Sequence, residues 1–150
     1  MPQFKFRLAT LLRLREATRD ERRSQLAQAY RAEEIVRAEA ERIEGELGDL
    51  EQLGRSACRP GHIDVDRLLE VRRYEAILQA QKQQAQKQQR MIEDEIERRR
   101  QAVAEANREV RVLEQLREKQ YQRHCQEEHR QEIKQLDEVG QRRAGKEVRP

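Results

Sequence analysis

The sequence predicts an all-α fold: a long two-helix antiparallel coiled-coil hairpin with a C-terminal helical overhang. Two stretches with heptad spacing, separated by one cluster of helix-breaking residues, are the main observations behind this prediction. The composition agrees, because 41% of the residues are charged and only 3% are aromatic, with no Trp. Such a composition cannot fill a layered globular core, but it can supply one narrow apolar stripe between two helices.

The clearest stripe lies between residues 90 and 120. Its positions are separated by steps of three, four or seven residues, and one slot is polar. Most other residues there are Glu, Arg or Gln, which are good helix formers. A helix that is polar outside its stripe must place that stripe against another helix. The stripe consists of Ile92, Ile96, Arg99, Val103, Ala106, Val110 and Leu113.

The first helix is expected over about residues 4–53, with slots three or four apart from Leu8 to Leu50. Between Leu12 and Leu26 these slots hold arginines, and two interpretations compete. Either the stripe shifts locally, as in a stutter, or the arginine stems lie flat on the partner with their charged ends in water. We favour the stutter. The shifted stripe would use Leu11, Leu14 and Thr18, and the alternative uses Arg15, Arg19 and Arg22.

A turn is expected over about residues 54–63, where Gly54, Pro60 and Gly61 interrupt the pattern. Asp64 is a good N-cap, so the second helix is expected over about 64–138. Glycines 140 and 145 predict that residues 139–150 are disordered. The 150 residues would then form a single coiled-coil domain.

A turn centred near Arg59 predicts that facing residues have numbers adding to about 118, which pairs Leu50 with Leu68 and Leu26 with Ile92. The second helix would then extend beyond the first from about Leu116. Apolar residues on an unpartnered helix predict a binding segment for another protein. These residues are Leu116, Tyr121, Ile133, Leu136 and Val139.

No enzyme motif is present, and we expect neither catalysis nor a cofactor. The sequence has no Gly-rich phosphate loop, and its serines lack an activating His and Asp. Cys125 and His129 share a helix face, but with Glu132 as a weak third ligand they make an incomplete metal site. We therefore expect no metal.

The net charge of +3 is a small surplus over 29 acidic residues, so a mixed-charge surface is a better interpretation than a nucleic-acid interface. A homodimeric structural coiled coil is the main alternative function, and nucleic-acid binding is the third. Two widely separated cysteines predict a reducing compartment, and the longest apolar run near the start, residues 8–12 with one Thr, is too short for a signal or membrane segment. We expect a cytoplasmic protein.

Two stretches resemble the flagellar FliJ family of bacterial flagellar type III export chaperones. They are FKFRLATLLRLRE, residues 4–16, and REVRVLEQLREKQYQ, residues 108–122. The resemblance implies a non-enzymatic adaptor that links the export ATPase ring to the cytoplasmic domain of the membrane export gate and handles export chaperones. It also implies a chain that is monomeric when free and associates peripherally with the inner membrane through the export apparatus.

The resemblance further implies two groups of partner-binding residues. The gate contact lies on the second helix near the turn, and the ATPase contact lies at the open end of the hairpin. By position, the gate group is Tyr74, Leu78, Gln81 and Ala85, and the ATPase group is Arg13, Arg15, Leu116 and Tyr121.

Overall fold

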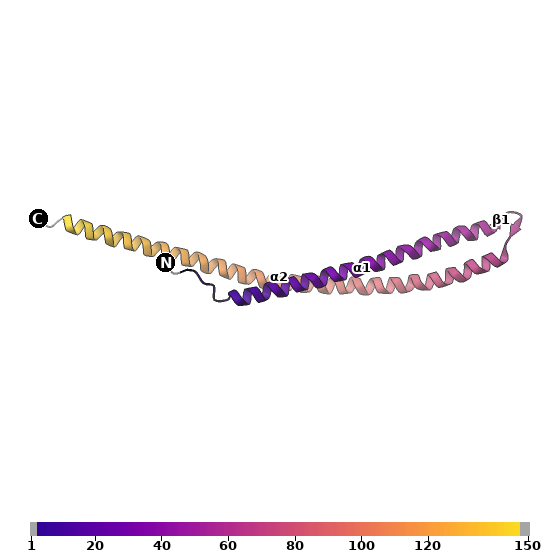
Figure 1. The fold of residues 1–150 in the computed structure, drawn as a ribbon, viewed down its shortest axis with the longest axis horizontal. Coiled ribbons are helices and arrows are strands. Elements are labelled where there is room, and N and C mark those ends of the chain that lie inside the picture. Colours follow the sequence, from indigo (N-terminus) through magenta and orange to yellow (C-terminus); the bar gives the residue numbers. More distant parts are fainter. Residues whose placement is uncertain (1–2, 148–150) are drawn as a thin grey trace. The chain divides into compact units, whose positions relative to one another are not determined.

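The computed structural model describes residues 3–147 and contains two long helices joined by a short β-turn (Figure 1). Helix α1 is Ala9–Ala57 and helix α2 is Val65–Glu147. Strands β1, Cys58–Arg59, and β2, His62–Ile63, have two residues each. The predicted all-α, two-helix antiparallel hairpin is confirmed. The chain divides into two compact units, residues 20–104 and residues 1–19 with 105–150, which are described separately.

Helix α1 begins five residues later and ends four residues later than predicted. Phe4, Phe6 and Leu8 are not α-helical, and the first turn is formed where the Ala9 amide donates to the Phe6 carbonyl, 3.2 Å away. At the other end, Gly54 is helical and lies against Val71. A glycine inside a helix costs about 1 kcal/mol relative to Ala, which packing against a neighbouring helix can offset.

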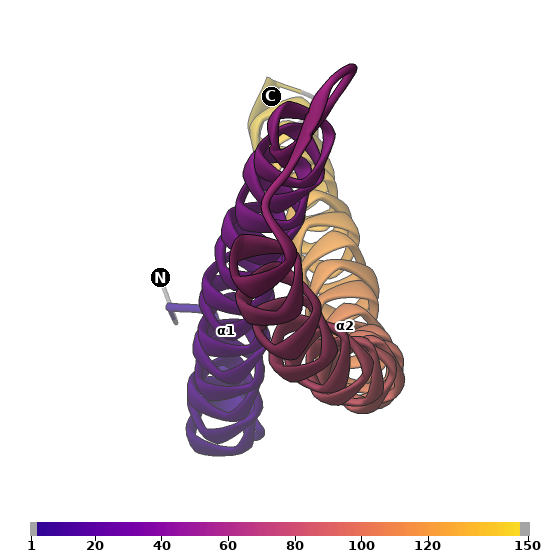
Figure 2. The same ribbon diagram turned by 90° about the vertical axis from the view of Figure 1, so that its right-hand side faces the viewer.

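The turn is a tight two-stranded hairpin, seen end-on in Figure 2. Strands β1 and β2 pair antiparallel, with Cys58 opposite Ile63 and Arg59 opposite His62. Pro60 and Gly61 occupy the central positions, and Gly61 has a φ of 93°. This is the arrangement that a type II turn favours, since Pro presets the first φ and Gly tolerates the left-handed second one.

Asp64 caps α2, as the sequence predicted. Its Oδ1 atom accepts a hydrogen bond from the Arg67 amide at 3.2 Å, which satisfies one free N–H group of the first turn. The helix then continues to Glu147 through Gly140 and Gly145. The predicted disorder from residue 139 is therefore wrong for residues 139–147, because isolated glycines among good helix formers weaken a helix without ending it. Residues 148–150 lie outside the described part of the chain.

In the unit of residues 20–104, α1 and α2 pack along the predicted stripes. Ile43 and Leu78 are almost fully buried, and Ala85 joins them in one cluster. Leu47 and Leu50 pack against this cluster from α1. Farther from the turn the buried residues include Ala29 and Ile96, so this interface contains both small and large apolar side chains.

Hydrogen bonds and ion pairs across the helices reveal a register different from the predicted one. Arg99 Nη1 donates to the Gln25 carbonyl at 2.5 Å, and Lys82 Nζ lies 3.3 Å from Glu44 Oε1. The residue numbers of these pairs add to 124 and 126 instead of about 118. The strands around Pro60–Gly61 pair residues whose numbers add to 121, so the later centre of the turn accounts for about half of the difference.

In the other unit, the start of α1 packs on the middle of α2 through Leu12, Ala106 and Val110, all buried. The residues of the predicted stutter are divided, since Leu14 is 62% exposed while Leu11 and Thr18 are partly buried. Arg15 is half-buried, and its Nη1 atom donates to Glu109 Oε2 at 2.9 Å. The alternative therefore holds at Arg15 but not at Arg22, which is exposed. An arginine stem can cover apolar surface while its charged end meets a carboxylate.

Candidate partner-binding surfaces

Two of the four predicted gate-binding residues lie in the core. Leu78 is 2% exposed and Ala85 is 4% exposed, and both pack beside Ile43. Their apolar side chains hold α1 and α2 together, so the structure gives them a packing role and leaves little surface for another protein. Tyr74 and Gln81 are exposed on α2.

Tyr74 borders a shallow cavity of about 250 Å³ between the two helices near the turn. Its lining combines apolar side chains from both helices with one basic and one acidic residue. We call this cavity the turn-end groove; its lining residues are Leu50, Leu53, Arg67, Glu70, Val71 and Tyr74. A concave apolar surface with a polar rim is the kind of site that holds an apolar anchor of a partner.

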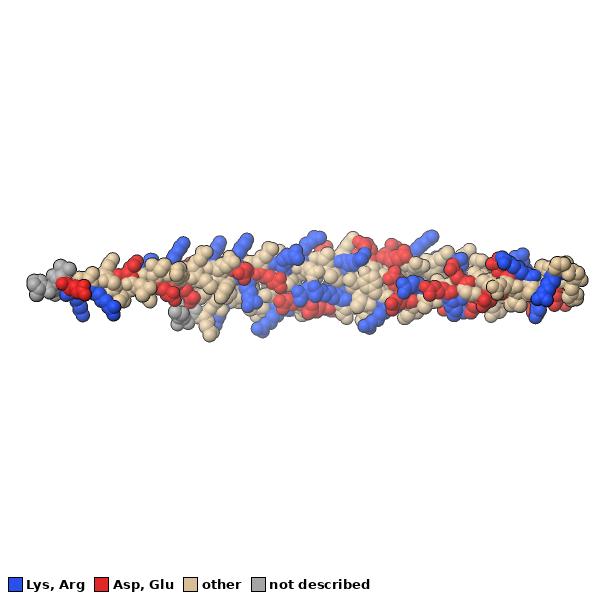
Figure 3. All heavy atoms as spheres, turned by 90° about the horizontal axis from the view of Figure 1, so that it is seen from above, with Lys and Arg blue, Asp and Glu red and all other residues tan. Residues whose placement is uncertain are grey.

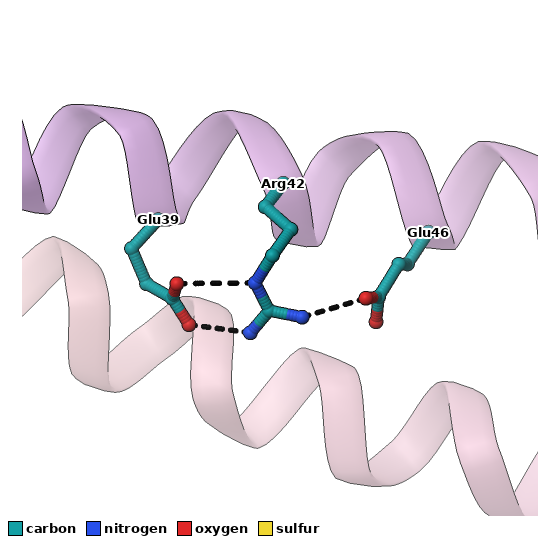
Figure 4. Close-up of polar contacts among 3 residues, drawn as sticks. All are labelled: Glu39, Arg42 and Glu46. Carbon is teal, nitrogen blue, oxygen red and sulfur yellow. Dashed lines mark hydrogen bonds and ion pairs between the residues drawn. The ribbon is translucent and has the colours of Figure 1, made fainter.

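A charged cluster lies on α1 farther from the turn. Figure 4 shows Arg42 between Glu39 and Glu46, with α2 behind. The Arg42 Nε and Nη2 atoms donate to Glu39, and its Nη1 atom donates to Glu46 at 2.6 Å. The hydrogen bond from Arg42 lowers the pKa of Glu39, and the two carboxylates raise the pKa of Arg42. Arg42 therefore stays charged and is engaged by two carboxylates of its own helix.

The predicted ATPase-binding residues all lie in the unit that contains the start of α1. Arg13 is exposed, whereas Arg15 is engaged with Glu109. Leu116 and Tyr121 are 36% and 48% exposed. The structure therefore brings an exposed guanidinium, an aliphatic residue and an aromatic residue into one compact unit.

The predicted overhang is partly covered by the N-terminal segment, which the sequence interpretation assigned to the first helix. The Phe4 ring contacts Tyr121 edge-on, with centroids 5.4 Å apart and planes at 68°, and lies 5.7 Å from the His124 ring. The alternation of Phe4, Phe6 and Leu8 was the signal that could have indicated an extended segment here. Farther along α2, the apolar residues Ile133, Leu136 and Val139 are exposed.

The His and Cys residues of α2 form side-chain pairs. His124 Nε2 lies 3.3 Å from Glu128 Oε1. Interaction with Cys125, mainly a side-chain hydrogen bond, raises the pKa of Tyr121. Among the described residues, no group of three or more His, Cys, Asp or Glu side chains is arranged to hold a metal ion.

The surface carries both charges in close alternation. On the face drawn in Figure 3, acidic and basic side chains are interspersed along both helices. Many of these charges pair along one helix, for example Arg55 with Glu51 and Arg98 with Glu95. Within residues 3–147, neither helix contains a stretch apolar enough to cross a lipid bilayer.

These features define a class: antiparallel coiled-coil hairpins with exposed apolar side chains along their helices. Comparison with known protein families shows which family within this class the chain belongs to. The family described as flagellar FliJ protein matches residues 4–149, nearly the whole chain, and the chain therefore belongs to the FliJ family. The family is a non-enzymatic component of the flagellar export apparatus, which functions in flagellar protein export and flagellum biogenesis. Comparisons with curated proteins and with solved structures found no match.

Proposed function

We propose that this chain is an adaptor of the flagellar export apparatus that binds the export ATPase through one compact unit and the cytoplasmic domain of the export gate through the other. The observation that carries the proposal is the family match over residues 4–149, together with a separate exposed apolar surface in each unit. Handling of export chaperones and peripheral association with the inner membrane would follow from membership of this assembly.

The turn-end groove is the proposed gate-binding surface. Tyr74 is 57% exposed, and Leu53 of α1 lines the same groove. A tyrosine beside an aliphatic floor supplies large contact area at a low cost in conformational entropy, which is why tyrosine is enriched among residues that dominate binding energy. Gln81 lies on the same helix two turns beyond Tyr74 and would contribute polar contacts.

The proposed ATPase-binding surface combines Arg13 with Leu116 and Tyr121. The two α2 residues are only partly covered by the N-terminal segment, and Arg13 is exposed at the start of α1. A homodimeric coiled coil is less well supported, because Ile43, Leu78 and Val110 already bury their side chains within one chain. Nucleic-acid binding is also less well supported, since acidic side chains accompany the arginines along both helices.

Two single substitutions should separate the two interactions. We expect Tyr74→Ala to weaken binding to the gate cytoplasmic domain at least tenfold, about 1.4 kcal/mol, while binding to the export ATPase is retained. We expect Tyr121→Ala to do the reverse. Both affinities would be measured by titration of the purified full-length chain.

Tyr30→Ala is the matched control, because Tyr30 is a partly exposed tyrosine of α1 outside both surfaces. It should leave both affinities unchanged. Equal losses for all three variants, or wild-type affinity for both partners in Tyr74→Ala and Tyr121→Ala, would reject the assignment of these surfaces.

A further inference from the structure

The N-terminal segment, Gln3–Leu8, lies on α2 as a peptide ligand would lie in a groove. It is not helical, and Phe4 and Phe6 are half-buried while Lys5 and Arg7 point outward as exposed residues. This alternation is that of an extended chain with one side against a surface. The segment belongs to the same compact unit as the part of α2 that it covers.

Side chains alone hold this segment on α2. Its backbone hydrogen bonds are local: the Phe6 carbonyl accepts from Ala9, and the Leu8 carbonyl accepts from Leu12. Across residues 3–147, no backbone hydrogen bond joins the segment to α2. The Phe4 ring makes the aromatic contacts with Tyr121 and His124. Contacts of this kind are lost when a short segment opens locally, whereas the helices remain paired.

The segment fills its site incompletely. A cavity of about 260 Å³ adjoins both Phe4 and Phe6, and Phe4 and Tyr121 both line another of about 460 Å³. Carboxylates outnumber guanidinium groups in the lining of these cavities. The acidic residues are Glu16, Glu114 and Glu118, and the basic residues are Arg13 and Arg117. Larger aromatic side chains and positive charge would therefore both improve the fit.

We propose that the surface of α2 beneath this segment is a docking groove for a basic segment of another protein that carries aromatic residues at alternate positions. The chain's own N-terminal segment is its resident occupant, and the partner segment displaces it. Tyr121 provides the ring against which the partner's aromatic side chain packs. The groove shares Arg13 and Tyr121 with the proposed ATPase-binding surface, so this inference rests on that proposal and adds the chemistry that the groove recognises. The peptide test below uses no ATPase, so it can fail while the ATPase assignment stands.

A labelled hexapeptide with the chain's own sequence, Gln-Phe-Lys-Phe-Arg-Leu, tests the groove directly by fluorescence anisotropy with the full-length protein. The resident segment competes with the peptide for the groove. The apparent affinity of the peptide is therefore its intrinsic affinity multiplied by the fraction of molecules in which the groove is open. We therefore expect the Phe4→Ala/Phe6→Ala variant to bind the peptide at least tenfold more tightly than the wild type. Adding Tyr121→Ala should abolish this gain.

The controls use the same variant background. Adding Tyr30→Ala should leave peptide binding unchanged, and a peptide with its two Phe residues adjacent should bind at least tenfold more weakly. A peptide with Trp in place of both Phe residues should bind more tightly, because the cavities beside Phe4 have room for it. Circular dichroism should show equal helicity in all variants, since Phe4 and Phe6 precede α1.

Three results would overturn the proposal. The first is equal peptide affinity in the wild type and the Phe4→Ala/Phe6→Ala variant, and the second is no saturable binding to that variant. The third is a wild-type protein that dimerises in light scattering while the variant stays monomeric, since the groove would then serve a second copy of this chain instead of a different protein.

Discussion

Replacing Leu78 by Ala tests whether this residue belongs to the core or to a partner-binding surface. Its side chain is 2% exposed and packs beside Ile43, with Leu47 and Leu50 next to the same cluster. The neighbouring Ile77 is 55% exposed on the same helix and is the matched control. The two residues have similar size and similar helix propensity, so burial is the main difference between them.

The expected cost of Leu78→Ala follows from the atoms removed. Leu→Ala deletes about three methylene equivalents, and burial of each contributes about 0.8 kcal/mol, or about 2.4 kcal/mol in total. A residual cavity adds to this cost, but a two-helix interface open to solvent on both sides can collapse around it. We expect a loss of about 2–3 kcal/mol in the free energy of unfolding. Ile77→Ala should cost about 0.5 kcal/mol or less.

Urea denaturation followed by helical circular dichroism would measure both values, and the thermal midpoint should fall by roughly 5–10 °C for Leu78→Ala. Binding to the gate domain at a temperature where both variants are folded provides the second measurement. The core assignment of Leu78 would be refuted if Leu78→Ala were as stable as Ile77→Ala but bound the gate domain more weakly.

Two further predictions concern the turn and the pH dependence of stability. Gly61→Ala should destabilise the chain by roughly 1–2 kcal/mol, because the φ of 93° is unfavourable for Ala. Gly48 lies in open space within α1, so Gly48→Ala should stabilise the chain by about 0.5–1 kcal/mol. Equal shifts in thermal midpoint for the two variants would contradict this. Glu95 has a pKa lowered below 4.5, chiefly by a hydrogen bond from Arg99, so its ionised form contributes stability above pH 4.5 that is lost as pH falls through the lowered pKa. The difference in thermal midpoint between wild type and Glu95→Gln should therefore be largest at pH 6 and should shrink towards pH 3; a difference that stays constant over this range would show that ionisation of Glu95 is not its source.

Among the residues predicted to bind partners, the predicted register placed Leu78 near Ile43 between the helices, whereas the family resemblance placed it on a partner-binding surface, and the sequence alone did not resolve this conflict. The resemblance to the family indicated a spacing of three and four residues from Tyr74 to Ala85, and that spacing alternates between the stripe and its edge. The residue numbers of facing pairs add to 121 in the turn and to 124 and 126 along the helices, instead of about 118, and this offset sets which side chains face each other. The sequence contains the stripe of each helix but not the offset between the two stripes, because that offset depends on how many residues the turn consumes.

The sequence by itself determined that two long helices pair antiparallel around Pro60 and Gly61, because heptad spacing and turn chemistry are local properties of the chain. It also determined the cap at Asp64. Only the tertiary structure decided the register, the burial of Leu78 and Ala85, and the place of Arg15 beside Glu109. It alone decided that Phe4 leaves the helix and packs on Tyr121. The contacts of Arg15 and Phe4 join residues about a hundred positions apart. Whether the chain continues a helix at Phe4 or covers an aromatic side chain is settled only when that distant side chain is present.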